Sequence, residues 1–323
     1  MSAQAIDRWG GCIAEVLQGQ AHELVAPGKD PLSDVDIAFV SRDVTGRPTK
    51  HEVLPDTQHF YDLLLQAPRL RWVQIHSAGV DRPVYLELLR RGVQVTTSAG
   101  ANARVVAQTV LAGVLALARR LPQLQRAQAE RRWAPLLGPD TPRDLEGQTA
   151  LVVGWGPIGQ QVTHLLQSLG LRVSVARMND TPVGPDIPTA SYRDIERLLP
   201  QADWVILACP LTEATHHLMD ARALALLPPG AHLVNVSRGD VVDEPALIAA
   251  LHSGRLAGAF LDVFAHEPLV PDSPLWAMPH VIATPHSAGF ADSNAARVAD
   301  VFLANLARWR QGLPLAGAVS GAP

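Results

Sequence analysis

Cysteine is scarce in this chain, and neither sign of charge dominates it. The two cysteines, Cys12 and Cys209, lie far apart and form no CxxC pair. They provide neither a disulfide framework nor a cysteine metal knuckle, which is typical of proteins in the reduced cytosol. The net charge of −4 and the pI near 6.3 leave no basic excess that would favour nucleic acid or an anionic membrane surface as a partner.

Long apolar segments, repeats and low-complexity tracts are also absent. The longest apolar stretch, 109–118, is too short to cross a bilayer and is followed by Arg119 and Arg120. Residues 1–20 lack a basic start followed by an apolar core, so we expect no signal peptide. These absences together favour a cytoplasmic protein.

The chain does contain enough apolar sequence for two domains. It has 323 residues, of which 47% are hydrophobic and 18% charged, so we expect a large core and no global disorder. From residue 149 onward, apolar runs typical of buried strands alternate with helical patterns, which predicts a doubly wound parallel sheet with helices on both faces. The expected strands are 149–153, 171–176, 204–208, 232–236, 259–263 and 280–283, and the expected helices are 158–168, 195–199, 221–227 and 244–252.

The first hundred residues predict a second, smaller α/β unit. Two longer helical patterns, 103–120 and 292–312, lie near its borders, and the second of them could return the chain to this unit. We therefore predict one discontinuous domain of residues 1–101 and 290–323, and a second domain of residues 102–289. The expected strands of the smaller unit are 36–41, 72–76 and 93–97, and its expected helices are 6–17 and 84–91.

Residues 154–159 read GWGPIG, which matches the pattern GxGxxG. With 24 glycines in 323 residues, roughly 0.1 such matches are expected by chance, so the pattern depends on its context. An apolar run enters the loop and a helical pattern leaves it, and this combination forms an anion site for the diphosphate of a dinucleotide. Gly154 would allow the tight turn, Gly156 the approach of the phosphate, and Gly159 the close packing of helix on strand.

The residue that ends the next predicted strand indicates the cofactor. In dinucleotide-binding folds this position carries an acid that binds the ribose of NAD, or an arginine that binds the 2′-phosphate of NADP. Here strand 171–176 is followed by Arg177, whose guanidinium can bind a phosphate through two hydrogen bonds. We therefore predict a preference for NADP(H) over NAD(H). In the alternative, Arg177 is a solvated strand end, and Asn179 or Asp180 binds a ribose hydroxyl.

Three later segments each follow a predicted strand and carry a side chain suited to catalysis. Arg238 lies in 235–240, Glu267 in 262–269 and His286 in 284–289. Because the carboxyl ends of parallel strands share one edge of a sheet, we expect these side chains to converge near the nicotinamide end of the cofactor. Taken singly, Arg238 could form an ion pair with Asp240 in a turn, and Glu267 could be a solvated loop acid.

Together with Ser77-Ala78-Gly79-Val80-Asp81, these motifs make the chain resemble the D-isomer-specific 2-hydroxyacid dehydrogenase family. The likeness runs through most of the chain, and Arg177 makes it most like the glyoxylate/hydroxypyruvate reductase branch. It implies a Rossmann dinucleotide-binding domain and a smaller flavodoxin-like substrate domain, both with doubly wound parallel sheets. It also implies hydride transfer from NAD(P)H to a small 2-oxo acid to give the D-2-hydroxy acid, in an enzyme that is usually a homodimer.

The resemblance implies a role for each matching residue of the substrate site. Arg238 would bind the substrate carboxylate and polarise the carbonyl, which suits a permanent cation. His286 would donate a proton to the carbonyl oxygen, and Glu267 would orient the imidazole and favour its charged form. The backbone at Ala78 and Gly79 would bind the substrate carboxylate from the smaller domain.

The resemblance also implies the cofactor contacts. The aspartate that matches Asp262 contacts the nicotinamide carboxamide in the family. The cofactor-binding residues implied by the motifs are Gly154, Gly156, Pro157, Ile158, Gly159, Arg177, Pro210, Thr212, Ser237, Asp262, His286 and Gly289.

Other histidines give weaker indications. His76 borders the 77–81 segment and could touch the substrate, whereas His266 is interpreted as a loop residue and His280 as the start of a strand. His216 and His217 are adjacent, so their side chains point apart, and neither a cysteine nor a carboxylate completes a site. We therefore expect no metal centre.

The chain departs from the family pattern at two places. Gln108 stands where the linker helix of the family usually has a glutamate, and residues 6–17 read as a helix where the family begins with a strand. The first strand is therefore missing or replaced. Trp133 and Trp276 either wall the substrate pocket, from this subunit or a neighbouring one, or pack in the core.

Two other functions stay open from the sequence alone. A formate or phosphite dehydrogenase uses the same scaffold, although a Glu–His pair fits hydroxyacid chemistry better than the Gln–His arrangement of the formate branch. A nucleotide-sensing corepressor would keep similar residues, and the lack of tails for peptide recruitment argues against it. Turnover of NADPH with a panel of 2-oxo acids separates these functions.

Overall fold

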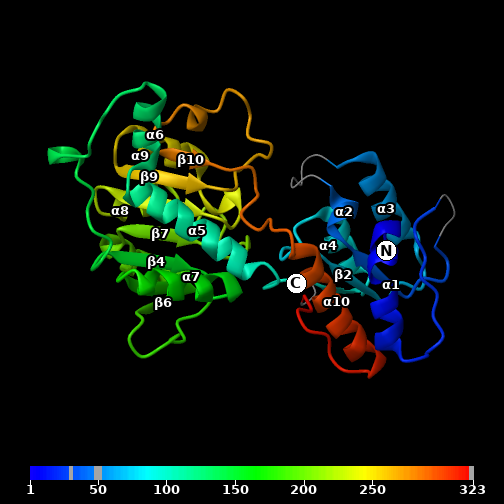
Figure 1. Cartoon of the computed structure of the whole chain (residues 1–323). Helices are drawn as coiled ribbons and strands as arrows, with labels where there is room; N and C mark the ends of the chain where they lie inside the picture. Colours follow the sequence, from blue (N-terminus) through cyan, green and yellow to red (C-terminus); the bar gives the residue numbers. More distant parts are fainter. Residues whose placement is uncertain (29–31, 47–52, 320–323) are drawn as a thin grey trace. The chain divides into compact units, whose positions relative to one another are not determined.

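The chain forms two units, each with its own sheet, and it passes from the first unit to the second and back again (Figure 1). The computed structural model describes residues 1–28, 32–46 and 53–319. Unit 1 comprises Met1–Asn102 and Ala291–Pro323, and unit 2 comprises Ala103–Phe290.

Unit 2 is built on seven parallel strands whose order reverses at β4. The strands are β4 (Thr149–Val153), β5 (Arg172–Arg177), β6 (Thr189–Ser191), β7 (Trp204–Leu207), β8 (Ala231–Asn235), β9 (Leu256–Leu261) and β10 (Val281–Ala283). Across the sheet their order is β10-β9-β8-β7-β4-β5-β6. The chain therefore moves outward from β4 to β6 and then returns to the other side of β4, where β7 pairs. The doubly wound sheet expected for this part of the chain is confirmed.

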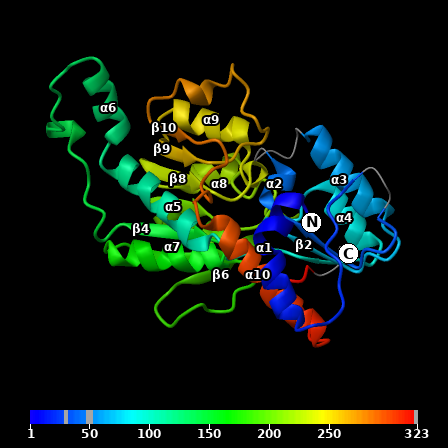
Figure 2. The ribbon, with the colours of Figure 1, turned by 45° about the vertical axis from the view of Figure 1, so that its right-hand side comes forward.

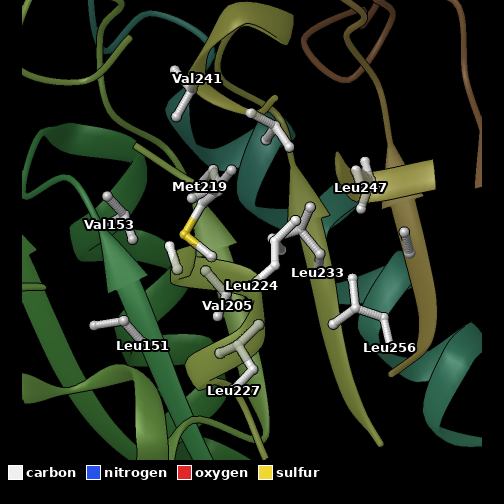
Figure 3. Close-up of a cluster of buried hydrophobic side chains, with 14 of the residues drawn as sticks. Leu151, Val153, Val205, Met219, Leu224, Leu227, Leu233, Val241, Leu247 and Leu256 are labelled. Atoms are coloured by element: carbon white, nitrogen blue, oxygen red, sulfur yellow. The ribbon is translucent and has the colours of Figure 1, made fainter. Parts of the chain in front are cut away.

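Helices cover both faces of this sheet, because its strands are apolar on both sides. Leu151 and Val153 contribute to the core under α8 (Ala221–Leu226) and α9 (Glu244–His252). The alternate residues Ala150 and Val152 contribute to the core under α5 (Ala103–Ala118) and α7 (Pro157–Ser168). Figure 3 shows the first of these cores, in which Met219 lies among side chains from β4, β7 and α8.

Unit 1 is a smaller α/β layer structure, with three parallel strands in the residues that the structure describes. The strands are β1 (Ile37–Val40), β2 (Trp72–Ile75) and β3 (Gln94–Thr96), and they follow one another across the sheet in chain order. One face packs on α3 (Pro55–Gln66) and α4 (Pro83–Arg90). The other face packs on α1 (Ala3–Leu17) and α10 (Asn294–Arg310), which lie side by side (Figure 2).

Aromatic stacking anchors the C-terminal helix in unit 1. Phe302 of α10 stacks on Phe39 of β1 with a centroid distance of 4.6 Å and on Trp72 of β2 at 5.6 Å. Trp309, about two helix turns later, stacks on the same Trp72 at 5.6 Å. The second helical pattern expected near the border therefore does return the chain to unit 1, as its apolar spacing indicated.

Several local expectations need correction. Residues 195–199 form no α-helix: two short 3-10 segments, Tyr192–Arg197 and Leu199–Gln201, take their place. Pro200 lacks a backbone donor and clashes with the preceding turn, so a longer α-helix is excluded here. The sequence did not predict β6, α3, α2 (Arg42–Thr45) or α6 (Leu121–Ala129). The helical start of the chain is confirmed as α1.

One further property of the helices bears on membranes. Within the residues that the structure describes, no single helix is long and apolar enough to span a bilayer. Helices α5 and α6 pass that test only as a pair, and they are bent by 67° relative to each other.

Candidate active site

The glycine loop joins β4 to α7 with little space to spare. Gly154 has φ +108°, and a Cβ there would lie 2.7 Å from the carbonyl oxygen of Ala208. A Cβ at Gly159 would overlap the carbonyl oxygen of Gly154. By contrast, no atom lies within 4 Å of the position that a Cβ of Gly156 would take. The close backbone packing around Gly154 and Gly159 therefore leaves no room for a side chain. Gly156, by contrast, faces open space at the start of α7, where backbone N–H groups favour an anion.

Arg177 ends β5, at the same carboxyl edge of the sheet as the glycine loop. Its Nη1 donates a hydrogen bond to the carbonyl oxygen of Thr181 at 3.4 Å, and the N–H of Thr181 donates to Oδ1 of Asn179 at 3.3 Å. Asn179 and Asp180 are exposed. Arg177 therefore lies at the base of a polar surface loop, where a guanidinium can meet a phosphate group.

The segment after β8 fixes the backbone of Arg238. Oδ1 of Asn235 accepts hydrogen bonds from the N–H and the hydroxyl of Ser237 at 3.0 and 2.7 Å, and Nδ2 of Asn235 donates to the carbonyl of Arg238 at 3.0 Å. The next residue, Gly239, packs so closely on the backbone of Phe264 that no side chain fits. The Arg238 segment is thereby joined directly to the segment that carries Glu267.

His286 and Glu267 form a hydrogen-bonded pair. Nδ1 of His286 lies 2.8 Å from Oε2 of Glu267, whose other oxygen, Oε1, accepts the N–H of Phe264 at 3.2 Å. A carboxylate only accepts, so Nδ1 carries the proton in this contact and Nε2 is the nitrogen left for a substrate. The Glu267 side chain is 10% exposed and that of His286 is 36% exposed, so the carboxylate is shielded while the ring reaches solvent.

Asp262 positions the segment that carries His286. Its Oδ1 accepts hydrogen bonds from the hydroxyl of Thr284 at 2.6 Å and the N–H of Ser287 at 2.9 Å, and its Oδ2 accepts the N–H of Ala288 at 2.9 Å. Burial raises the pKa of Asp262 above its ordinary value, and these hydrogen bonds and the charge on His286 act against that rise. The sequence suggested Asp262 only as a cofactor contact and did not reveal this second task.

The comparisons with known proteins agree with this geometry. The model of the D-isomer specific 2-hydroxyacid dehydrogenase NAD binding domain matches residues 111–288, more than half of the chain. The chain belongs to this family. The resemblance noted from its motifs is thus confirmed.

Two reductases and one solved dehydrogenase are similar to this chain over most of its length. A glyoxylate reductase of Korarchaeum cryptofilum is 35% identical over 76% of the chain and 75% of its own length. A glyoxylate/hydroxypyruvate reductase B of Citrobacter koseri is 39% identical over 69% of the chain and 70% of its own length. A D-isomer specific 2-hydroxyacid dehydrogenase from Xanthobacter autotrophicus Py2, solved in complex with NADPH and MES, is 31% identical, with a TM-score of 0.77 over 98% of this chain and 94% of that chain.

The segment after β7 lies at the same edge and contains Pro210 and Thr212. Thr215, which is fully buried, organises it: its hydroxyl donates to the carbonyl of Pro210 at 2.6 Å and accepts the N–H of Thr212 at 2.8 Å. The sequence gave no sign of this role, because a buried threonine three residues away resembles any loop residue. Cys209 precedes the segment, and burial raises the pKa of its thiol to about 12, so it stays a neutral thiol.

Ala78 and Gly79 belong to unit 1 and follow β2. The hydroxyl of Ser77 donates to the carbonyl of Gly79 at 2.8 Å, which curls this segment at the end of the strand. His76, just before it, has its Nε2 2.9 Å from the hydroxyl of Thr45. Burial, with the nearby charges of Arg42 and Arg82, lowers the pKa of His76 to about 3. His76 is therefore neutral at pH 7 and carries no imidazolium proton to give to a substrate.

The remaining candidates lie on the surface. His266 is exposed, with Nδ1 3.2 Å from the carbonyl of Pro268. The exposed His216 and His217 do not point apart as expected: their rings stack with centroids 4.0 Å apart, because His217 has φ +48° and lies in neither a helix nor a strand. Over residues 1–28, 32–46 and 53–319, no three His, Cys, Asp or Glu side chains group to hold a metal. Trp133 is 97% exposed and Trp276 is 55% exposed, so core packing was the wrong interpretation for both.

Proposed function

We propose that this enzyme reduces a small 2-oxo acid of the glyoxylate/hydroxypyruvate type to the D-2-hydroxy acid, with NADPH as hydride donor. The observation that carries the proposal is the 2.8 Å pair of His286 and Glu267, which follows the same sheet edge as the glycine loop. The reductases of K. cryptofilum and C. koseri support the choice of substrate class.

The geometry suggests how each residue would act on such a substrate. Arg238, a permanent cation, binds the substrate carboxylate and polarises the neighbouring carbonyl. Glu267 accepts the hydrogen bond from Nδ1 and so orients the imidazole of His286, and His286 then donates its Nε2 proton to the carbonyl oxygen. The bound nicotinamide supplies the hydride that goes to the carbonyl carbon. His286 is left neutral and recovers its proton from solvent through its exposed face.

The preference for NADPH rests on Arg177. Gly154, Gly156, Pro157, Ile158 and Gly159 fit a diphosphate, because open space faces Gly156 at a helix N-terminus. Arg177 then lies where a 2′-phosphate is expected, and no acid ends β5. The NADPH complex of the X. autotrophicus relative agrees with this choice. We keep Pro210, Thr212, Ser237, Asp262, His286 and Gly289 as further cofactor contacts.

The proposal extends to domains, assembly and compartment. Unit 2 is the dinucleotide-binding domain and unit 1 the substrate domain, with the backbone of Ala78 and Gly79 binding the substrate carboxylate. A homodimer is supported by residues 121–146, which extend from unit 2 in Figures 1 and 2 and expose Trp133 and Leu137 by 97% and 70%. The two free cysteines, Cys12 and Cys209, support a cytoplasmic location.

Steady-state kinetics with a substrate panel tests this function. The panel contains glyoxylate, hydroxypyruvate, pyruvate and larger 2-oxo acids with NADPH or NADH, and formate and phosphite with the oxidised cofactors. We expect the highest kcat/KM with glyoxylate or hydroxypyruvate and NADPH. A higher kcat/KM with NADH would overturn the role of Arg177. Oxidation of formate or phosphite would favour that dehydrogenase class, and NADPH binding without any turnover would favour a nucleotide sensor.

A further inference from the structure

Thr109 forms a hydrogen bond that the proposed mechanism does not use. It lies on α5, and its hydroxyl is 3.0 Å from the carbonyl oxygen of Ala288, a residue 179 positions later in the chain. The same hydroxyl is 3.2 Å from the carbonyl of Val105, the contact that a helical threonine commonly makes within its own helix. A hydroxyl has one proton, and the shorter distance to Ala288 indicates that the proton is directed there.

Ala288 ends the segment that positions His286. His286 has φ +49°, a left-handed conformation that residues with a side chain rarely adopt, and it therefore needs support from its surroundings. Asp262, the residue after β9, provides that support: its side chain accepts the N–H groups of Ser287 and Ala288, and its carbonyl accepts the N–H of His286 at 2.8 Å. Thr109 holds the same segment at the carbonyl oxygen of Ala288. Asp262 cannot bind this oxygen, because a carboxylate only accepts hydrogen bonds.

The hydrogen bond also joins the two places where the chain enters and leaves unit 2. Helix α5 begins at Ala103, the first residue of unit 2, and Ala288 lies two residues before its last residue, Phe290. Unit 1 has a matching contact: Nε of Arg297 donates to the carbonyl of Ala101 at 2.7 Å. In each unit, a side-chain hydrogen bond therefore links the chain segment near the first passage between the units to the segment near the second. In unit 2 this hydrogen bond involves the segment that carries His286.

We infer that Thr109 is a positioning residue, whose hydroxyl fixes the His286 segment against α5 so that the imidazole keeps its alignment for proton transfer. This inference rests on the proposed function of His286. It predicts that loss of this one hydroxyl group slows proton transfer while cofactor binding stays unchanged.

The test compares Thr109→Val, which keeps the shape of the side chain, with Thr109→Ser, which keeps the hydroxyl. Single-turnover oxidation of NADPH by glyoxylate is measured in H2O and D2O, and NADPH affinity by quenching of tryptophan fluorescence. For Thr109→Val we expect a rate about fivefold lower, the equivalent of one hydrogen bond of about 1 kcal/mol, and a larger solvent isotope effect. Thr109→Ser should stay within about twofold of the wild-type rate. A merely structural role would leave the isotope effect unchanged.

Thr163→Val is the control, because Thr163 is likewise a threonine on a helix of unit 2, and its buried hydroxyl has no hydrogen-bond partner within the described residues. It should leave the rate and the isotope effect as they are. An unchanged rate in Thr109→Val, or an equal loss in Thr163→Val, would overturn the inference while the proposed function stands.

Amide hydrogen exchange of residues 284–290 tests the hydrogen bond without any turnover. Faster exchange there in Thr109→Val, but not in Thr163→Val, supports the inference, and unchanged exchange contradicts it. If the wild-type protein oxidises no NADPH with any 2-oxo acid, the proposed function fails, and the exchange experiment still decides whether Thr109 restrains this segment.

Discussion

The two sheets of the molecule share their construction but differ in strand order, and this difference locates the cofactor site. In unit 2 the order reverses between β4 and β7, so that the connections on either side of β4 leave in opposite directions and open a crevice at the carboxyl edge. The glycine loop follows β4, the strand at which the order reverses. In the described part of unit 1 the three strands follow chain order, and no such reversal occurs. The same type of layer therefore carries the glycine loop in one unit, whereas in the other we propose that the segment after β2 meets the substrate.

The largest expected effect is a loss of kcat on substitution of a histidine in unit 2, which substitution of a histidine in unit 1 should not cause. His286→Ala should lower kcat about a hundredfold or more, because a positioned proton donor is lost, and should leave the affinity for NADPH within a few fold. His76→Gln in unit 1 retains a polar atom for Thr45 and should change kcat less than about fivefold, because the pKa of His76, lowered to about 3, keeps it neutral. Steady-state kinetics of the purified variants at pH 7 provides the measurement.

Two results would break this comparison. Near-normal turnover in His286→Ala would remove His286 from the proposed role. A loss in His76→Gln as large as that in His286→Ala would place part of the proton transfer in unit 1. His252→Ala, at the exposed end of α9, is the control for removing a histidine ring from unit 2.

The next expected effect concerns two glycines of the loop after β4, the strand at which the strand order reverses. Gly159→Ala should lower the free energy of unfolding of unit 2 by roughly 2–3 kcal/mol, because its Cβ overlaps the backbone of Gly154. Gly156→Ala should leave stability nearly unchanged, since nothing lies within 4 Å of its Cβ, and should weaken NADPH binding about tenfold, because a methyl group then occupies space needed by the phosphate. Denaturant unfolding and fluorescence titration measure the two quantities. Equal NADPH affinity in Gly156→Ala and the wild type would show that the diphosphate does not approach this residue.

The sequence predicted the parts of the fold that rest on apolar runs and chain punctuation. The bounds expected for 149–153 and 244–252 agree with β4 and α9, because each segment combines a strong apolar pattern with clear ends. It missed β6 and α3, since β6 has only three residues and α3 carries several polar side chains among its apolar ones. Short elements of this kind are stabilised by the neighbours they pair with, and a local pattern does not show those neighbours.

The candidate site divides in the same way. Arg238, Glu267 and His286 could be predicted, because each follows a strand and their chemical types are characteristic. The supporting contacts could not, because the bond from Thr109 to Ala288 and the fit of Gly239 on Phe264 join segments far apart in the sequence. Asp262 was identified for its match to the family motif, while its three hydrogen bonds to the His286 segment depend on how two loops pack.

The smallest expected effect concerns acid, and it compares His76 in unit 1 with His232 in unit 2, because burial lowers the pKa of both. Burial lowers the pKa of His76 in unit 1 to about 3 and, with the charge of Arg120, that of His232 in unit 2 to about 4. An unfolded histidine titrates near pH 6.5, so below that pH the unfolded chain binds protons that the folded chain does not. The free energy of unfolding must therefore fall as the pH drops from about 6.5 toward each folded pKa. For His232 alone, roughly 2 kcal/mol should be lost between pH 7.5 and 5.

A substitution at His232 should remove this dependence from unit 2 and leave it in unit 1. His232→Phe preserves an aromatic ring against Trp204, whose ring centroid lies 4.2 Å from that of His232. Hydrogen-exchange protection factors of β7 and β8, corrected for the intrinsic pH dependence of exchange, should then fall less with acid than in the wild type, while those of β2 in unit 1 fall as before. His252→Phe, at an exposed position, should behave as the wild type. If β7 and β8 lose protection equally in His232→Phe and the wild type, then groups other than His232 make unit 2 sensitive to acid.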